Sequence, residues 1–225
     1  MRNWYKRGDT KLKALIVSIS RIFKKSRLTL DFDNINKPVS TMRETSTTIY
    51  QELEKKNRSA FLDLGLLVYM EAYAEVKPES KPGKDAAQEK INEKWLDSLQ
   101  GEYNPVTKYV YAREVERKRA RFFESTVADV EAKDRRGLES DYRTAENLWT
   151  RQTRQAMIDV EDRAAHDGYK AAGVKHVQWI TQQDAGVCSE CEALNGLIFP
   201  IDRIPDKPHY NCRCYVRPIG DDVTE

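Results

Sequence analysis

All four cysteines of this 225-residue chain lie in one short segment near its C-terminus. Cys188 and Cys191 form a C-x2-C pair, and His209, Cys212 and Cys214 follow in an H-x2-C-x-C arrangement. Thiolate sulfur and imidazole nitrogen are the donors that structural zinc sites use, and a C-x2-C turn supplies two of them at once. The segment therefore predicts a zinc site made from four of these five side chains.

The spacing leaves the choice among the five donors open. Cys188 and Cys191 have the spacing of a zinc knuckle. On a strand, Cys212 and Cys214 would point to the same face and could both reach the metal. His209 could replace one cysteine as a ligand or donate a hydrogen bond to a thiolate. The alternative without a metal is a small lobe in which the cysteines pack as apolar groups.

Catalytic chemistry has little support in the sequence. A catalytic zinc keeps one position for water and has a carboxylate base nearby, and nothing in the pattern places the glutamates of the knuckle over a metal. An HNH-like nuclease is the enzymatic alternative, because His209 and Asn211 suit it in type. Such a nuclease needs further histidines after the knuckle, whereas His166 and His176 precede it. We therefore expect no enzymatic activity and no small-molecule substrate.

Composition favours a mainly helical protein. Apolar residues make up 40% of the chain and charged residues 33%, while ten glycines and eight prolines are few for this length. Apolar runs such as residues 14–17 are too short to cross a bilayer, so we expect no membrane span. In a reducing cytoplasm, four clustered cysteines are more plausible as a metal site than as disulfides.

The first 28 residues predict a basic amphipathic arm. Apolar residues recur at helical spacing over residues 10–25, and this helix could dock on a partner. A single aspartate accompanies nine cations, so we expect contacts with DNA or an acidic protein surface, the alternative being a solvated terminus. The cations are Arg2, Lys6, Arg7, Lys11, Lys13, Arg21, Lys24, Lys25 and Arg27.

Breaks in the hydrophobic pattern divide the following region into helices. A polar break at residues 31–37 precedes a long helix, which a capping box of Thr41 and Glu44 opens and Pro78 closes. Another helix is expected over residues 85–99.

Asn104 and Pro105 are expected to open a third helix, with Asn as N-cap and Pro in the first turn. Its basic stretch at residues 109–123 is interleaved with aromatic residues, a weak indication of nucleic-acid binding. Glu114 lies four residues before Lys118, so a solvated helix with internal ion pairs is the favoured interpretation.

A last long helix starts near Leu138 and is expected to end near Gly168 or Gly173, before a short strand at residues 176–180. The predicted fold is mainly α, with an elongated helical N-terminal region followed by a small α+β lobe that zinc clamps. The predicted parts are a basic arm at 1–28, a helical domain at 29–173 and a Cys/His-rich lobe at 174–225.

The C-terminal segment resembles the signature of the Mu F-like minor head, or head morphogenesis, proteins of tailed bacteriophages. The residues that carry the resemblance are Val177-Gln-Trp-Ile180, Asp184, Val187-Cys188-Ser-Glu-Cys191, Leu194-Asn-Gly196, Ile204-Pro205 and Lys207-Pro-His209-Tyr-Asn-Cys212-Arg-Cys214. Upstream, a further likeness to members from phages and prophages of Gram-positive bacteria is carried by Asn104-Pro105, the residues 111–121 and Leu148-Trp-Thr-Arg-Gln152.

The resemblance covers about residues 100–219 and implies a low-copy structural protein of the virion head, assembled in the cytoplasm of the host bacterium. Its implied partners are the portal protein and the major capsid or scaffold protein, with packaged DNA as a further candidate through a role in DNA delivery. It implies no enzymatic activity. A zinc-dependent nucleic-acid-binding module is the second hypothesis.

Overall fold

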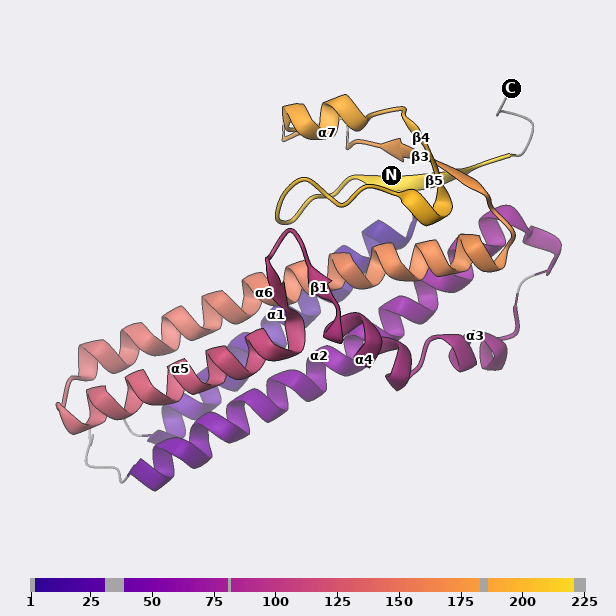
Figure 1. The fold of residues 1–225 in the computed structure, drawn as a ribbon. Coiled ribbons are helices and arrows are strands. Elements are labelled where there is room, and N and C mark those ends of the chain that lie inside the picture. Colours follow the sequence, from indigo (N-terminus) through magenta and orange to yellow (C-terminus); the bar gives the residue numbers. More distant parts are fainter. Residues whose placement is uncertain (1–2, 31–38, 81, 183–185, 221–225) are drawn as a thin grey trace.

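The computed structural model describes residues 3–30, 39–80, 82–182 and 186–220, and it is mainly helical with a small sheet lobe at the C-terminus (Figure 1). The predicted fold class is therefore confirmed. The helical region consists of α1 (Asn3–Leu30), α2 (Val39–Val76), a 3-10 turn (Pro78–Ser80), α3 (Lys84–Lys90), α4 (Glu93–Gly101), a hairpin of β1 (Tyr103–Asn104) and β2 (Tyr109–Val110), α5 (Tyr111–Glu131) and α6 (Arg135–Ala171). In the described residues, no helix is both long and apolar enough to span a membrane.

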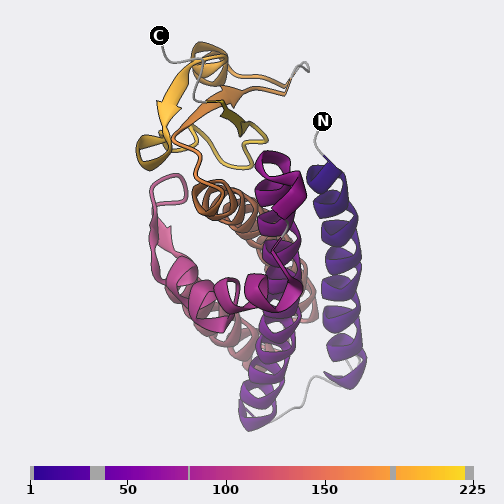
Figure 2. The ribbon, with the colours of Figure 1, turned by 90° about the vertical axis from the view of Figure 1, so that its right-hand side faces the viewer.

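The four long helices α1, α2, α5 and α6 pack side by side into a bundle (Figure 2). Aromatic rings fill the end of the bundle at which α5 turns into α6. The Phe122 ring lies 5.0 Å from that of Tyr142, and the Tyr50 ring lies 5.3 Å from that of Trp149 in an edge-to-face arrangement. Such pairs add directional preference to the burial of large apolar area, so this end is a well-defined core.

Helix α1 is part of this bundle. Its side chains Ile19 and Phe23 have no exposed surface and Leu15 is only 5% exposed, all within the same core cluster as α2 and α6. The Phe23 ring lies 6.2 Å from those of Phe122 and Tyr142. The amphipathic helix expected in the basic segment thus docks its apolar face on the chain's own core.

Helices α2 and α6 have the predicted limits to within a few residues, whereas α1 extends beyond the predicted residues 10–25 at both ends. Helix α2 begins two residues before Thr41, so the proposed capping pair of Thr41 and Glu44 lies inside its first turns. The break predicted at residues 31–37 lies outside the described residues. Helix α6 starts at the N-cap Asp134 and runs past Gly168 to Ala171. Gly168 permits close contact there, because a Cβ would lie 2.6 Å from the Tyr69 carbonyl oxygen of α2.

The expected helix at residues 85–99 is two short helices, α3 and α4. They are separated at Ile91 and Asn92, and the Asn92 side chain caps α4 by accepting a hydrogen bond from Trp95 N at 3.1 Å. Ile91 is the C-cap of α3, and Asn92 starts α4 because its side chain replaces the missing backbone acceptor.

The prediction that Asn104 caps the third helix is wrong. Asn104 lies in the β1–β2 hairpin, where its Oδ1 accepts hydrogen bonds from Val106 N and Thr107 N, both at 2.9 Å. Helix α5 starts later, at Tyr111. The predicted ion pair within α5 is present, with Glu114 3.0 Å from Lys118 Nζ and also bound by Arg117.

The C-terminal lobe, residues 174–220, lies over helix α6 on one side of the bundle (Figure 1). Its antiparallel sheet has the order β4-β3-β5, formed by β3 (His176–Ile180), β4 (Ile198–Pro200) and β5 (Tyr215–Ile219), with α7 (Ser189–Leu194) and a 3-10 turn (Ile201–Arg203) between them. The strand predicted at residues 176–180 is confirmed. The placement of Cys212 and Cys214 on a strand is wrong, since both lie in the loop before β5.

Candidate metal centre

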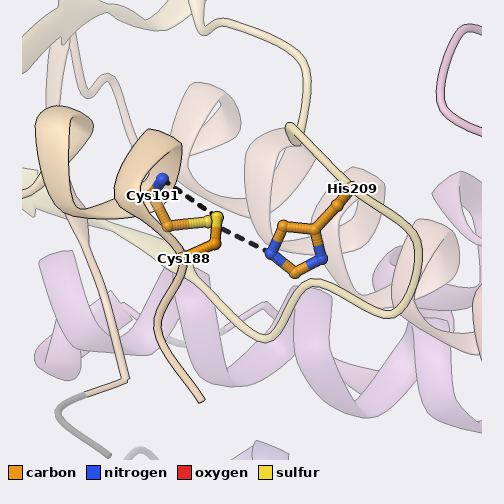
Figure 3. A group of neighbouring side chains, drawn as sticks. All are labelled: Cys188, Cys191 and His209. Atoms are coloured by element: carbon orange, nitrogen blue, oxygen red, sulfur yellow. Dashed lines mark hydrogen bonds between the residues drawn. The ribbon is translucent and has the colours of Figure 1, made fainter. Parts of the chain in front are cut away.

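The first two cysteines are held by the start of helix α7. Cys188 is the N-cap of this helix, and its sulfur accepts a hydrogen bond from the backbone N–H of Cys191 at 3.3 Å (Figure 3). A residue at the N-cap and one three positions later face each other across the first turn. The C-x2-C spacing therefore brings the two sulfurs to one side of the helix start.

The remaining three donors come from one loop, residues 207–214, which we term the donor loop. His209 Nε2 lies 3.4 Å from the Cys191 sulfur (Figure 3), and the Cys212 sulfur lies 3.5 Å from the same atom. Asn211 has φ of 57°, a left-handed conformation that Asn tolerates better than most residues. This turn reverses the loop between His209 and Cys212.

All five predicted ligands come together around Cys191. The donor atoms of Cys188, Cys191 and His209 lie within 4.8 Å of one another, and so do those of Cys191, Cys212 and Cys214. Cys191 belongs to both groups, so it is the common corner of the cluster. The cluster could hold a metal ion, and the geometry keeps both donor sets possible.

The orientation of the His209 ring suits a ligand. Its Nδ1 lies 3.0 Å from the backbone carbonyl oxygen of Tyr210, so this nitrogen carries the proton and donates. The lone pair then resides on Nε2, the nitrogen that faces the Cys191 sulfur. Metal-binding histidines commonly have this arrangement, because a hydrogen bond at one nitrogen fixes the ring for coordination at the other.

The cluster is closed on most sides. Cys191, Cys212 and Cys214 are at most 4% exposed and pack with Trp179, whereas Cys188 is partly exposed. Burial raises the pKa of the Cys191 and Cys212 thiols, while the N–H of Cys191 holds the pKa of the Cys188 thiol below its ordinary value. Buried thiolates need a compensating cation, which a metal ion would supply.

The donor loop is also fastened to helix α6. Lys207 Nζ lies 2.7 Å from Asp162 Oδ2 and donates to the Cys212 carbonyl oxygen at 3.2 Å. The Tyr210 hydroxyl donates to the backbone oxygen of Arg151 at 3.1 Å, and Asn211 N donates to Gln155 Oε1 at 2.8 Å. The residues that present the donors thus also join the lobe to the bundle.

The contacts between the donor loop and α6 could not be predicted from the spacing of residues in the sequence. Lys207 and Asp162 are far apart in the sequence, and the carboxylate has no pattern that pairs it with this lysine. Burial lowers the pKa of Lys207, but the charge and hydrogen bond of Asp162, together with the nearby Cys212 and Glu161, outweigh this effect, so the pKa of Lys207 is raised. The ammonium therefore remains charged inside the junction, with a side chain only 12% exposed.

The basic residues of the N-terminal segment are not gathered into one site. Arg7 pairs with Glu71 at 2.5 Å and Lys11 lies 3.9 Å from Asp63, both across the α1–α2 contact. The side chains of Lys13, Arg21, Lys24, Lys25 and Arg27 are exposed. Arg2 lies outside the described residues, and the structure describes no side chain for Lys6.

The other two histidines lie apart from the metal-binding groups of the described chain. His166 Nδ1 contacts Asp167 at 3.0 Å on helix α6, and His176 starts strand β3. The comparison of this chain with protein-family models, curated proteins and solved structures finds no match.

Proposed function

We propose that the cluster binds one zinc ion as a structural clamp and that the chain acts as a minor structural protein of a tailed-phage head. In this proposal zinc joins the α7 knuckle to the donor loop. The bundle and the lobe together form a rigid unit that binds the portal protein and the major capsid or scaffold protein inside the assembling head.

The observation that carries the zinc proposal is the convergence of donors on Cys191. In a tetrahedron with zinc–sulfur bonds of about 2.3 Å, two sulfurs lie about 3.8 Å apart. The Cys191–Cys212 distance of 3.5 Å and the Cys191–His209 distance of 3.4 Å are close to such edges. Zinc favours sulfur and imidazole donors together, so it is the metal that this donor set suits best.

A structural role is supported by the enclosure of the cluster. A catalytic zinc offers one coordination position to water and substrate. Here the donors outnumber four, and three of the four cysteines are buried. About 45 residues make too small a core to fold reliably alone, and a metal commonly supplies the missing stability in such lobes.

The role in the phage head is supported by the resemblance in the C-terminal segment. Residues that carry this likeness also make structural contacts in the lobe and in the bundle. Lys207 binds the lobe to the bundle, Trp179 packs with the cysteines, and Asn104 ties the hairpin to α6 through Asp159 at 2.9 Å. DNA delivery is part of the same proposal, through the exposed cations of α1.

Mass spectrometry of purified virions tests the function. The chain should be present at low copy number, and heads assembled without it should be defective in assembly or DNA delivery. Its absence from virions and normal particle yield without it would reject the proposal. Sequence-selective duplex binding by the isolated protein would instead favour the zinc-dependent nucleic-acid-binding module.

A further inference from the structure

Trp179 lies in the core of the C-terminal lobe, and its indole N–H has no hydrogen-bond partner among the described residues. The residue belongs to β3, the middle strand of the sheet, and is only 2% exposed. Its backbone is paired on both sides, because Trp179 N donates to the Leu197 oxygen and Gly196 N donates to the Trp179 oxygen, each at 2.9 Å. The sheet therefore fixes the position of the ring, and only the side-chain N–H is left over.

A buried N–H group without an acceptor is unusual in a folded protein. Nearly all such groups are paired, because a donor that has lost its water without gaining another acceptor is unfavourable. Water cannot take this role at Trp179, since Nε1 is inaccessible to solvent. The acceptor must therefore belong to the groups that surround the ring.

The groups that surround the ring contain sulfur. Trp179 forms one buried cluster with Cys191, Cys212 and Cys214, none of which is more than 4% exposed. These are also the three cysteines whose sulfurs form one of the two candidate metal-binding groups. A neutral thiol is a weak acceptor, whereas a metal-bound sulfur is a thiolate and accepts charge-assisted hydrogen bonds.

Other donors are already directed at the sulfurs of this cluster. Cys191 N donates to the Cys188 sulfur at 3.3 Å, and the backbone N–H of Cys214 donates to the Cys212 sulfur. The Lys207 ammonium is held beside them through the Cys212 carbonyl oxygen at 3.2 Å. A divalent ion bound by three or four thiolates retains negative charge, and burial of this charge requires nearby donors. The indole N–H of Trp179 suits the same task.

We propose that Trp179 is a positioning residue of the metal centre, and that its indole N–H donates a hydrogen bond to one of the three buried sulfurs when they bind zinc. This inference rests on the proposed zinc clamp. Hydrogen bonds from outside the ligand set orient the ligands and stabilise their charge. The affinity for the metal then depends on strand β3 as well as on the α7 knuckle and the donor loop.

Trp149 provides a matched control. Its Nε1 is also buried and has no partner within the part of the chain that the structure describes, but it lies in the bundle core against Tyr50. Competition with a coloured zinc chelator measures the affinity of the full-length protein for zinc. Trp179→Phe keeps an aromatic ring and removes the N–H, so it should lower the affinity roughly 10- to 100-fold. Trp149→Phe should leave the affinity unchanged.

Nuclear magnetic resonance of the wild-type protein gives a readout that a purely structural role would not change. Cadmium-113 takes the same thiolate and imidazole donors as zinc and can replace it. The indole proton of Trp179 should show scalar coupling to cadmium through the N–H···S hydrogen bond, and that of Trp149 should show none. This measurement needs no substitution, so it carries the test even if thermal unfolding shows that Trp179→Phe does not fold.

Two results would overturn the role of Trp179. One is an indole proton without coupling to bound cadmium, and the other is a folded Trp179→Phe protein that binds zinc as tightly as the wild type. Both would leave the zinc clamp intact. Wild-type protein that binds neither zinc nor cadmium would instead reject the clamp and this inference together.

Discussion

His209 Nε2 faces the sulfur of Cys191 at 3.4 Å while His209 Nδ1 donates to the Tyr210 carbonyl oxygen. This pair joins the two chain segments of the cluster, the α7 knuckle and the donor loop. The donor loop in turn contacts helix α6 through three side chains or backbone groups. The cluster and the lobe–bundle junction are therefore connected through the donor loop. A substitution that weakens one of them should also destabilise the other.

The ion pair between Lys207 and Asp162 should stabilise the attachment of the lobe. Lys207→Met leaves a partly buried carboxylate without its cation and removes the hydrogen bond to Cys212. We therefore expect the free energy of unfolding to fall by about 2 kcal/mol. This is less than the cost in a fully buried pair, because the Asp162 side chain is 36% exposed. Chemical denaturation followed by Trp fluorescence measures it. The double variant Lys207→Met/Asp162→Asn should recover part of the loss, and equal losses in the single and double variants would contradict the pairing.

Removal of the metal should loosen the donor loop from α6. With EDTA or a stronger chelator, backbone amides of residues 207–214 should exchange with deuterium faster, while those of α2 remain protected. Hydrogen-exchange mass spectrometry measures both in one sample. Unchanged protection of the loop after the metal has been stripped would show that the loop does not need the ion.

Helix α1 should contribute to the stability of the whole bundle. Phe23 is fully buried against Phe122 and Tyr142, so Phe23→Ala should lower the free energy of unfolding by roughly 3–5 kcal/mol. The control is Val17→Ala on the same helix, where the side chain is 49% exposed and the expected change is under about 0.5 kcal/mol. Equal melting temperatures for the two variants would contradict the packing of α1.

The exposed cations of α1 allow the partner contact to be tested without disturbing the core. The triple variant Lys13→Glu/Arg21→Glu/Lys24→Glu changes three exposed side chains and should melt near the wild-type temperature. Its incorporation into heads or its association with DNA should fall, most at low salt, because the attraction is electrostatic. Normal incorporation and DNA delivery would assign these residues to a solvated surface.

Glu161 should make stability depend on pH. It is 7% exposed, its carboxyl group lies against Gly8 of α1, and burial together with Asp162 and Asp9 raises its pKa from 4.5 to about 8 despite attraction by Lys207. Above pH 4.5 the unfolded chain loses this proton while the folded chain keeps it. The free energy of unfolding therefore declines as the pH rises from 4.5 toward 8.

Replacement by glutamine isolates this effect. Glu161→Gln should be more stable than wild type by roughly 1–3 kcal/mol at pH 8, and the difference should shrink toward pH 5. Denaturant titrations at several pH values measure the difference. A stability difference that is constant with pH would show that Glu161 is ionised in the folded protein.

Local patterns were sufficient for several elements. The strand at residues 176–180 was predicted from β-branched and aromatic residues, and α6 from a long 3.6-residue rhythm. The five donors could be predicted because metal ligands follow fixed short spacings on one turn and one loop. These features depend on neighbours in the sequence, which is why the sequence alone reveals them.

Features decided by distant contacts were missed. Asn104 followed by proline suits both a helix start and a turn, and its bond to Asp159, far along the chain, accompanies the turn. An amphipathic helix such as α1 shows the same pattern whether it covers its own core or a partner. The pairing of Lys207 with Asp162 has no local signal at all. Tertiary packing therefore supplied the junction between lobe and bundle.

The most direct test of the central claim is metal analysis of the full-length protein purified without chelators, combined with Cys191→Ser. We predict about one zinc per chain in the wild type and none in Cys191→Ser, because Cys191 belongs to both donor groups, together with a less stable C-terminal lobe. Wild-type protein that contains no metal and yet has a fully folded lobe would contradict the zinc clamp.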